Sequence, residues 1–256
     1  MQKEIAHTEL LMDMLSIPAV SRKEGERSDF LESFLQGLGY EVQRTFNNLL
    51  VGNTKASDSR IRILLNSHMD TVAPVEGWTT DPYAPILKGD QIFALGSNDA
   101  GASVVSLIAS FHQMKTKLEE KLDLLLLISA EEEVSGQKGI TAVLPLLDPV
   151  DGVIVGEPTG MHPAVAERGL MVLDGEAKGK AGHAARKEGE NAIYKVMRDM
   201  ESIQRLSLES KSEWLPEPSA QVTMISAGTS HNVVPDLCRF VVDVRSNDQY
   251  AVSDTH

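Results

Sequence analysis

The run LDLLLLISA at positions 122–130 constrains the fold of this chain more than any other segment. It is too short to span a bilayer, and it is too uniformly apolar for a strand with one face in water. The run therefore predicts a central strand that is buried on both faces of a sheet. Two further apolar runs, IRILLNS at 61–67 and GVIV at 152–155, predict buried strands of the same kind.

Amphipathic helical patterns accompany these strands. One covers the N-terminal segment, a second, ERSDFLESFLQGLGY, ends in glycine, and a third follows Gly101. Strands and helices in this arrangement predict an α/β fold with a mostly parallel central sheet.

Acidic or histidine residues follow each of these apolar runs and a shorter run, IFAL at 92–95. The carboxyl ends of parallel strands are where open α/β sheets place ligands and catalytic groups, so we expect these side chains to converge. They are His68 and Asp70, Asp99, the pair Glu131 and Glu132, and Glu157.

Each position also has a simpler local explanation. A strand-end histidine beside a solvated aspartate is common, and Asp99, taken alone, is most simply the N-cap of the helix that follows it. Consecutive glutamates are typical of an exposed turn or a helix start. The repetition of the pattern at four strand ends is what favours a shared site.

The order and spacing of these segments resemble the M20 family of dinuclear zinc aminoacylases and exopeptidases, from the N-terminal helix to about Arg245. The GEPT segment is similar to the acetylornithine deacetylase and succinyl-diaminopimelate desuccinylase branch. The resemblance implies that His68 and Glu157 hold one metal, that Asp99 bridges, and that Glu132 helps to hold the other. Two divalent metals are thus expected, zinc by donor type, with cobalt or manganese compatible.

The same resemblance implies catalytic roles for Glu131 and Asp70. Glu131 is expected to be the general base that takes a proton from water and returns it to the leaving amine. Asp70 is expected to orient His68.

Beyond Glu157 the sequence becomes rich in glycine and in alternating polar residues, which indicates exposed antiparallel strands. We expect a zinc-hydrolase catalytic domain at 1–162 and a smaller α+β lid or dimerisation domain at 163–256. In GKAGHAAR, His183 matches the family position that reaches across a dimer interface to the oxyanion. Asn232 and Arg245 match positions near the reaction centre and the substrate carboxylate, although each residue type is commonly structural in its context.

Two departures from the family pattern stand out. Asp99 is followed by Ala100, Gly101 and Ala102, where the family usually has a lysine and paired glycines. The family also returns from the lid to the catalytic domain through a long segment that carries a final histidine ligand. We expect that segment to be missing here and assign no such role to His256, so the chain is either a fragment of a longer enzyme or an incomplete catalyst.

Composition limits the partners and the cellular compartment that we expect for this protein. The net charge of −13, from 24 basic and 37 acidic residues, disfavours nucleic acid and anionic membranes as partners. The single cysteine, Cys238, leaves no intramolecular disulfide to form, and the N-terminus lacks the apolar core of a signal peptide. A cytoplasmic location is the expectation, and the resemblance to the M20 family implies a homodimer joined through the lid.

These features together predict a metal-dependent amidohydrolase. Its expected substrate is an N-acyl amino acid, first of all an N-acetyl- or N-succinylornithine type of metabolite in amino-acid biosynthesis such as that of arginine. Two alternatives remain, a dipeptidase or aminopeptidase and a non-catalytic metal-binding module.

Overall fold

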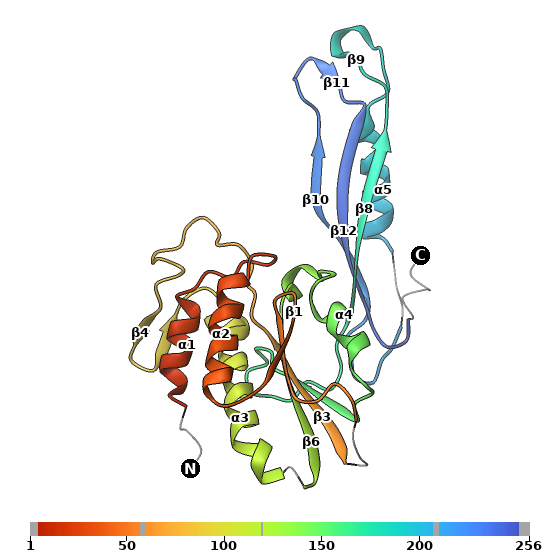
Figure 1. The fold of residues 1–256 in the computed structure, drawn as a ribbon. Helices are drawn as coiled ribbons and strands as arrows, with labels where there is room; N and C mark the ends of the chain where they lie inside the picture. Colours follow the sequence, from red (N-terminus) through yellow and green to blue (C-terminus); the bar gives the residue numbers. More distant parts are fainter. Residues whose placement is uncertain (1–4, 57–59, 119, 207–209, 251–256) are drawn as a thin grey trace. The chain divides into compact units, whose positions relative to one another are not determined.

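The computed structural model describes residues 5–56, 60–118, 120–206 and 210–250. The chain forms two compact units, Met1–Met161 (unit 1) and His162–His256 (unit 2). Each unit has a sheet of its own, and each is described separately below (Figure 1).

Unit 1 is built on a five-stranded sheet in the order β1-β2-β6-β3-β7. Strand β6 (Leu122–Ser129) is central and runs parallel to β3 (Ile61–His68), which is parallel to β7 (Gly152–Val155). Strands β1 (Val42–Thr45) and β2 (Asn48–Val51) form a hairpin that joins β6 antiparallel. The α/β class and the central place of the leucine-rich strand are therefore confirmed.

Shorter elements and helices complete unit 1. They are α1 (His7–Leu15), α2 (Gly25–Gly37), β4 (Ile86–Lys88), β5 (Gln91–Phe93), the π-helical turn η1 (Ser97–Gly101), α3 (Ala102–Leu118), η2 (Glu132–Val134), α4 (Ile140–Val143) and η3 (Leu144–Leu146).

Burial on both faces explains the uniform leucine content of β6. Leu124 and Leu126 pack on the face that α1, α2 and α3 cover, and Leu125 and Leu127 pack on the opposite face with Val143 of α4 (Figure 1). Alternate residues of a strand point to opposite faces, so a strand between two helical layers needs apolar residues at every position. This rigid centre holds the carboxyl ends of β3, β6 and β7 in place.

Strand β7 is the last strand of the sheet and pairs only with β3 within the described ranges. Its residues Val153, Ile154 and Val155 are each about half exposed. None of the helices in the described part of the chain is long and apolar enough to cross a membrane.

Unit 2 has a three-stranded antiparallel sheet in the order β10-β12-β8, with a helix on one face. Its elements are β8 (Gly169–Lys178), β9 (Gly182–His183), η4 (Ala184–Arg186), α5 (Ala192–Gln204), β10 (Ser219–Ala227), β11 (Val233–Val234) and β12 (Leu237–Ser246).

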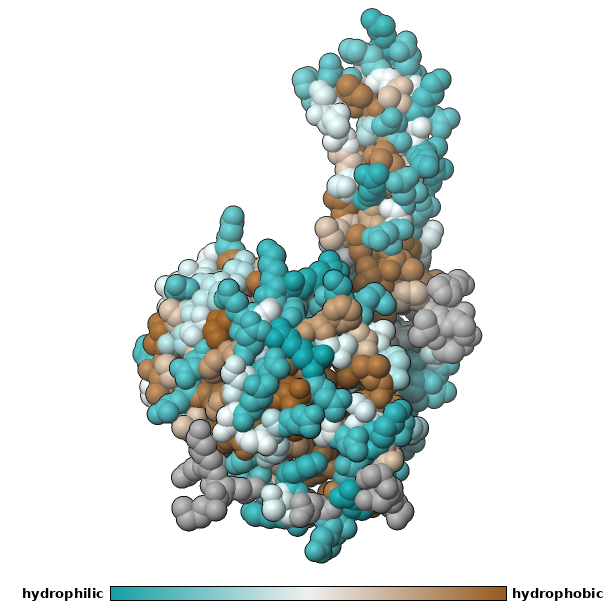
Figure 2. Space-filling view, in the orientation of Figure 1, coloured by the Kyte–Doolittle hydropathy of each residue, from teal (hydrophilic) through white to brown (hydrophobic). Residues whose placement is uncertain are grey.

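The core of unit 2 is small. Ala192 and Val196 of α5 are buried against Ala177 and Cys238 of the sheet. Hydrophobic residues, including Leu170 of β8 and Met224 of β10, also lie at the surface of this unit among hydrophilic ones (Figure 2).

Candidate metal centre

Four acidic side chains gather around the imidazole of His68, where the parallel strands β3, β6 and β7 end. Nε2 of His68 lies 3.1 Å from Oδ1 of Asp99 and 3.7 Å from a carboxylate oxygen of both Glu132 and Glu157. The fourth is Glu133, and one potential ligand atom from each of His68, Asp99 and Glu133 lies within 4.8 Å of the other two. We call these five residues the His68 cluster.

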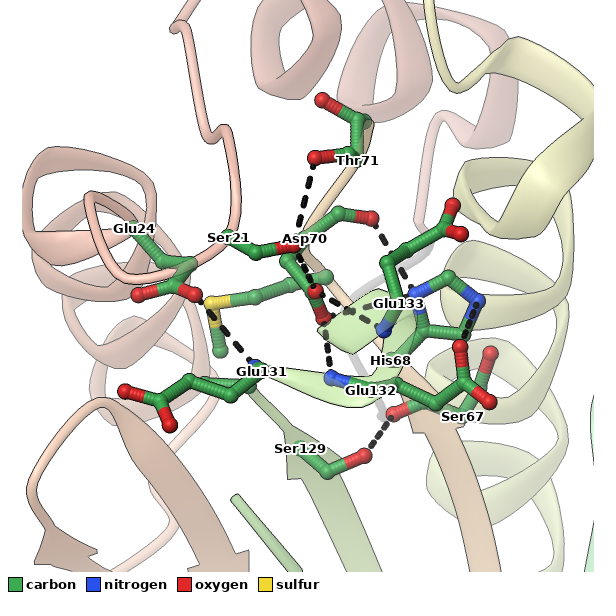
Figure 3. Close-up of polar contacts among 12 residues, drawn as sticks. Ser21, Glu24, Ser67, His68, Asp70, Thr71, Ser129, Glu131, Glu132 and Glu133 are labelled. Carbon is green, nitrogen blue, oxygen red and sulfur yellow. Dashed lines mark hydrogen bonds and ion pairs between the residues drawn. The ribbon is translucent and has the colours of Figure 1, made fainter. Parts of the chain in front are cut away.

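Asp70 is fully buried and supports the cluster from the other side of the imidazole (Figure 3). Its Oδ1 lies 3.5 Å from Nδ1 of His68 and accepts a hydrogen bond from the amide of Glu132 at 3.1 Å. Its Oδ2 accepts from the Ser21 hydroxyl at 2.7 Å and from the amide of Glu133 at 3.2 Å. One carboxylate thus orients the imidazole and also fixes the segment that carries both glutamates.

Glu131, the base expected from the sequence, lies outside the cluster. Its backbone is left-handed, with φ of 54°, and its carboxylate points to the opposite side of the loop from His68 (Figure 3). Oε2 of Glu131 accepts a hydrogen bond from the amide of Lys138 at 3.2 Å. The two glutamates that face His68 are therefore Glu132 and Glu133, one position later than expected.

The sequence could not distinguish these glutamates. The direction of each side chain depends on the left-handed turn at Glu131, and three identical residues in a row give no periodicity from which to read it. Glu133 was missed for this reason.

Asp99 lies in a kink between β5 and α3, with φ of −112° and ψ of 100°, and the Asp99–Ala100 peptide bond is cis. Within the described residues its carboxylate hydrogen-bonds His68 rather than the helix amides, so the N-cap explanation is wrong. Gly96 makes the kink possible, because its φ is 77° and a Cβ there would lie 2.5 Å from Cγ2 of Thr71.

Glu157 is placed by the contact between β3 and β7. The Ser67 hydroxyl donates to the carbonyl of Gly156 at 2.8 Å, and the amide of Gly156 donates to the carbonyl of Asn66 at 2.7 Å. These bonds hold the end of β7 beside His68.

The crowded carboxylates shift the proton affinities of the cluster. Burial disfavours the charged imidazolium of His68, but Asp70, together with the charges of Glu157 and Glu132, raises its pKa to about 9. Burial and the neighbouring carboxylates, opposed by His68, raise the pKa of Glu157 to about 7. Burial and the charge of Asp99 also raise the pKa of Glu133.

This donor set fits divalent cations. Within the described ranges, no lysine or arginine forms an ion pair with any of the four acidic residues of the cluster. One protonated imidazole does not balance four close carboxylates, which repel one another, and a divalent cation between them removes the remaining repulsion. Imidazole nitrogen and carboxylate oxygen are the usual donors for zinc and are accepted by cobalt and manganese.

Unit 2 separates the three site residues expected in it. The amide of Ala184 donates to the carbonyl of Asn232 at 3.0 Å, so His183 and Asn232 lie side by side where β9 pairs with β11. Arg245 lies near the far end of β12. At about 3.3 Å per residue, it is roughly 26 Å along the strand from Leu237, where β12 begins close to β11. Its guanidinium donates to both carboxylate oxygens of Asp243, at 2.8 and 3.1 Å.

Comparisons with known proteins agree with this geometry. Residues 165–255 match the peptidase dimerisation domain of the M20 group. The chain is 26% identical over 270 residues to a succinyl-diaminopimelate desuccinylase of Sphingopyxis alaskensis, covering 98% of this chain and 70% of the relative. It is 27% identical over 237 residues to an acetylornithine deacetylase of Myxococcus xanthus, covering 85% of this chain and 60% of the relative.

The fold also matches a solved structure. An M20 family metallo-carboxypeptidase of Sulfolobus solfataricus superposes with a TM-score of 0.74 at 16% identity, covering 98% of this chain and 74% of that chain. The chain therefore spans between 60 and 74% of the length of these three proteins.

The chain is therefore similar in sequence to a desuccinylase and a deacetylase, and it shares its fold with an M20 metallopeptidase. Residues 165–255, which lie in unit 2, match the M20 peptidase dimerisation domain.

Proposed function

We propose that this chain hydrolyses the amide bond of an N-acyl amino acid, with an acetylated or succinylated diamino acid of the ornithine type as the substrate. The observation that carries the proposal is the convergence of His68 with four carboxylates at the ends of the parallel strands. The names of the two curated relatives support acyl removal, and the carboxypeptidase neighbour makes peptide hydrolysis the second candidate.

In this proposal His68, Asp99, Glu133 and Glu157 would hold the metal. When bound, a pair of divalent cations supplies Lewis-acid activation of the amide carbonyl and of water. Asp70 keeps His68 Nδ1 engaged, so that Nε2 faces the cations.

Glu132 is proposed as the general base in place of Glu131. Its carboxylate lies 3.7 Å from Nε2 of His68, and its side chain is 53% exposed, so a substrate can reach it. It would take the proton of the attacking water and deliver it to the departing amine.

His183 and Asn232 are proposed to stabilise the oxyanion, and Arg245 to hold the substrate carboxylate with its planar fork. Their separation within unit 2 exceeds the length of a small metabolite, which supports a homodimer in which one copy supplies His183 and the other supplies Arg245. The single cysteine, which can form no intramolecular disulfide, supports a reducing compartment such as the cytoplasm.

Paired glutamine variants test the assignment of the base. Glu132→Gln should lower kcat by about 100-fold or more while metal content stays near wild type, because it removes a proton acceptor. Glu133→Gln should lower metal content, and Glu131→Gln should reduce kcat far less than Glu132→Gln. Metal analysis and steady-state kinetics on N-acetylornithine, N-succinylornithine and a dipeptide give these readouts.

Three results would contradict the proposed base or the proposed substrate. If Glu131→Gln has the largest kcat loss, the base is Glu131 after all. If the dipeptide is the best substrate, the enzyme is a peptidase. Stable metal binding without turnover of any of the three would favour a binding module.

A further inference from the structure

Unit 1 contains a cavity on the side of the loop to which Glu131 points, away from His68 (Figure 3). Its volume of about 560 Å³ lies within the range of small-molecule sites. The lining residues that matter here are Arg22, Glu24, Phe46, Glu131 and Lys138.

Two buried carboxylates line the cavity. Glu24 is fully buried and accepts hydrogen bonds from the amide of Arg22, the Asn47 side chain and the amide of Glu131. Glu131 is only 7% exposed, yet within the described residues its carboxylate accepts one hydrogen bond, from the amide of Lys138. Because an ionised carboxylate has about four acceptor positions, Glu131 is a buried anion with room for a further donor.

Two cations complete the lining. Arg22 and Lys138 are exposed, and neither forms an ion pair with any residue that the structure describes. The Lys138 ammonium lies 5.5 Å from the ring centre of Phe46, which is itself 58% exposed. The cavity thus offers both signs of charge beside an aromatic face.

The backbone around the cavity is unusual. Arg22, Phe46 and Glu131 have φ values of 73°, 53° and 54°, and they are three of the six non-glycine residues with positive φ in the described ranges. This conformation is strained for a residue with a Cβ atom and is concentrated at ligand-binding sites. Strain at three lining residues indicates a cavity whose shape is maintained.

We propose that this cavity binds an α-amino-acid zwitterion. The ammonium group bonds to the Glu131 carboxylate, the carboxylate group lies between Arg22 and Lys138, and the aliphatic stem packs on Phe46. The cavity and the His68 cluster lie on opposite sides of the loop that carries Glu131 and Glu132 (Figure 3). The zwitterion is therefore that of a free amino acid bound apart from the cluster.

Calorimetric titration of the full chain with three matched probes tests this site. The probes are L-norleucine, hexanoate, which lacks the ammonium group, and L-norleucinamide, which lacks the carboxylate. A chelator is present throughout, so that no probe binds through a cation at the cluster. L-norleucine should bind at least about tenfold more tightly than either of the others.

Charge-neutral variants locate the binding. Arg22→Gln and Lys138→Gln, both at exposed positions, should each weaken L-norleucine binding by about fivefold or more, and Glu131→Gln should remove its advantage over hexanoate. Lys23→Gln, an exposed neighbour that does not line the cavity, is the matched control. Equal binding of all three probes, or L-norleucine binding that survives both cation variants, would overturn the proposal.

Kinetics of the metal-loaded enzyme then show whether the cavity influences turnover. An effect of L-norleucine on KM or kcat that acts through the cavity should disappear in Arg22→Gln, whereas product-like binding at the cluster should remain in that variant. Binding is read without turnover, so a failure of the proposed hydrolysis leaves this test intact, and a failure of binding leaves the proposed hydrolysis intact.

Discussion

Asp70 is the residue on which the geometry of the His68 cluster depends most. It contacts the imidazole, the Ser21 hydroxyl and the amides of both glutamates that face His68. Its pKa lies below the usual range, because these hydrogen bonds and the charge of His68 outweigh the effect of burial. Asp70 therefore remains an anion under all physiological conditions.

Asp70→Asn should weaken metal binding by about 10- to 100-fold, as expected for the loss of a partner that orients a ligand. Metal titration against a competing chelator measures the change. Ser21→Ala, which removes only one donor to Asp70, is the control and should have a smaller effect. Equal affinity in Asp70→Asn and wild type would show that the carboxylate does not support the site.

The raised pKa values of His68 and Glu157 make the stability of the chelator-treated protein depend on pH. In the folded state His68 has a pKa of about 9, against 6.5 for the free side chain, and Glu157 one of about 7, against 4.5. Both groups bind protons more tightly when folded, so their stabilising contribution is present at low pH and is lost as pH rises.

Urea unfolding with chelator should therefore show a free energy of unfolding that falls between pH 6.5 and pH 9.5. The expected drop is up to about 3 kcal/mol, mainly from His68. With saturating zinc the trend should weaken or reverse, because cation binding displaces these protons. A free energy that rises with pH in chelator would show that the folded cluster does not hold the extra protons.

The sequence predicted the positions of some site residues but not the direction of every side chain. His68, Asp99, Glu132 and Glu157 come together as expected from their places at strand ends. The direction of Glu131 depends on a left-handed turn, and no pattern of residue types encodes that direction.

At the scale of elements, hydrophobic patterns predicted the strands that are buried on both faces and the helices that bury one regular face. Strand β6, the helix α2 that ends at Gly37, and the helix α3 that follows Gly101 all follow the predicted segments. The segment before α3 was not predictable, because its kinked backbone at Asp99 depends on a close contact between Gly96 and Thr71.

Gly96→Ala tests that kink. The added methyl group would meet Thr71 and would force a left-handed backbone on alanine, so we expect a loss of stability of more than about 1 kcal/mol together with weaker metal binding. Gly37→Ala is the matched control, because it lies in α2 with no atom near its Cβ position, and it should be neutral or stabilising by up to about 1 kcal/mol. Thermal unfolding and metal titration of both variants give the comparison. Wild-type stability in Gly96→Ala would mean that the loop does not require this conformation.

For the whole molecule, the arrangement within unit 2 leads to a prediction about assembly. If His183 acts in the site of a second copy, then Glu132→Gln and His183→Ala are each inactive alone but complement each other when mixed. A heterodimer of the two variants contains one intact site, so an equal co-expressed mixture should recover about a quarter of wild-type activity.

Co-expression with two affinity tags allows the doubly tagged heterodimer to be assayed alone, and it should have about half of wild-type activity because one of its two sites is intact. Each variant co-expressed with itself is the control. Absence of recovery in a confirmed heterodimer would place His183 and Glu132 in the same copy or remove His183 from the reaction.

The open side of β7 has a practical consequence for handling this polypeptide. Val153, Ile154 and Val155 present half-exposed apolar side chains on a strand whose backbone is unpaired on one side within the described ranges. Such an edge is a template for strands of other molecules, and neither a charge nor a proline within β7 interrupts it. We therefore expect concentrated solutions of this chain to associate through β7, and Ile154→Lys to reduce the association that light scattering measures.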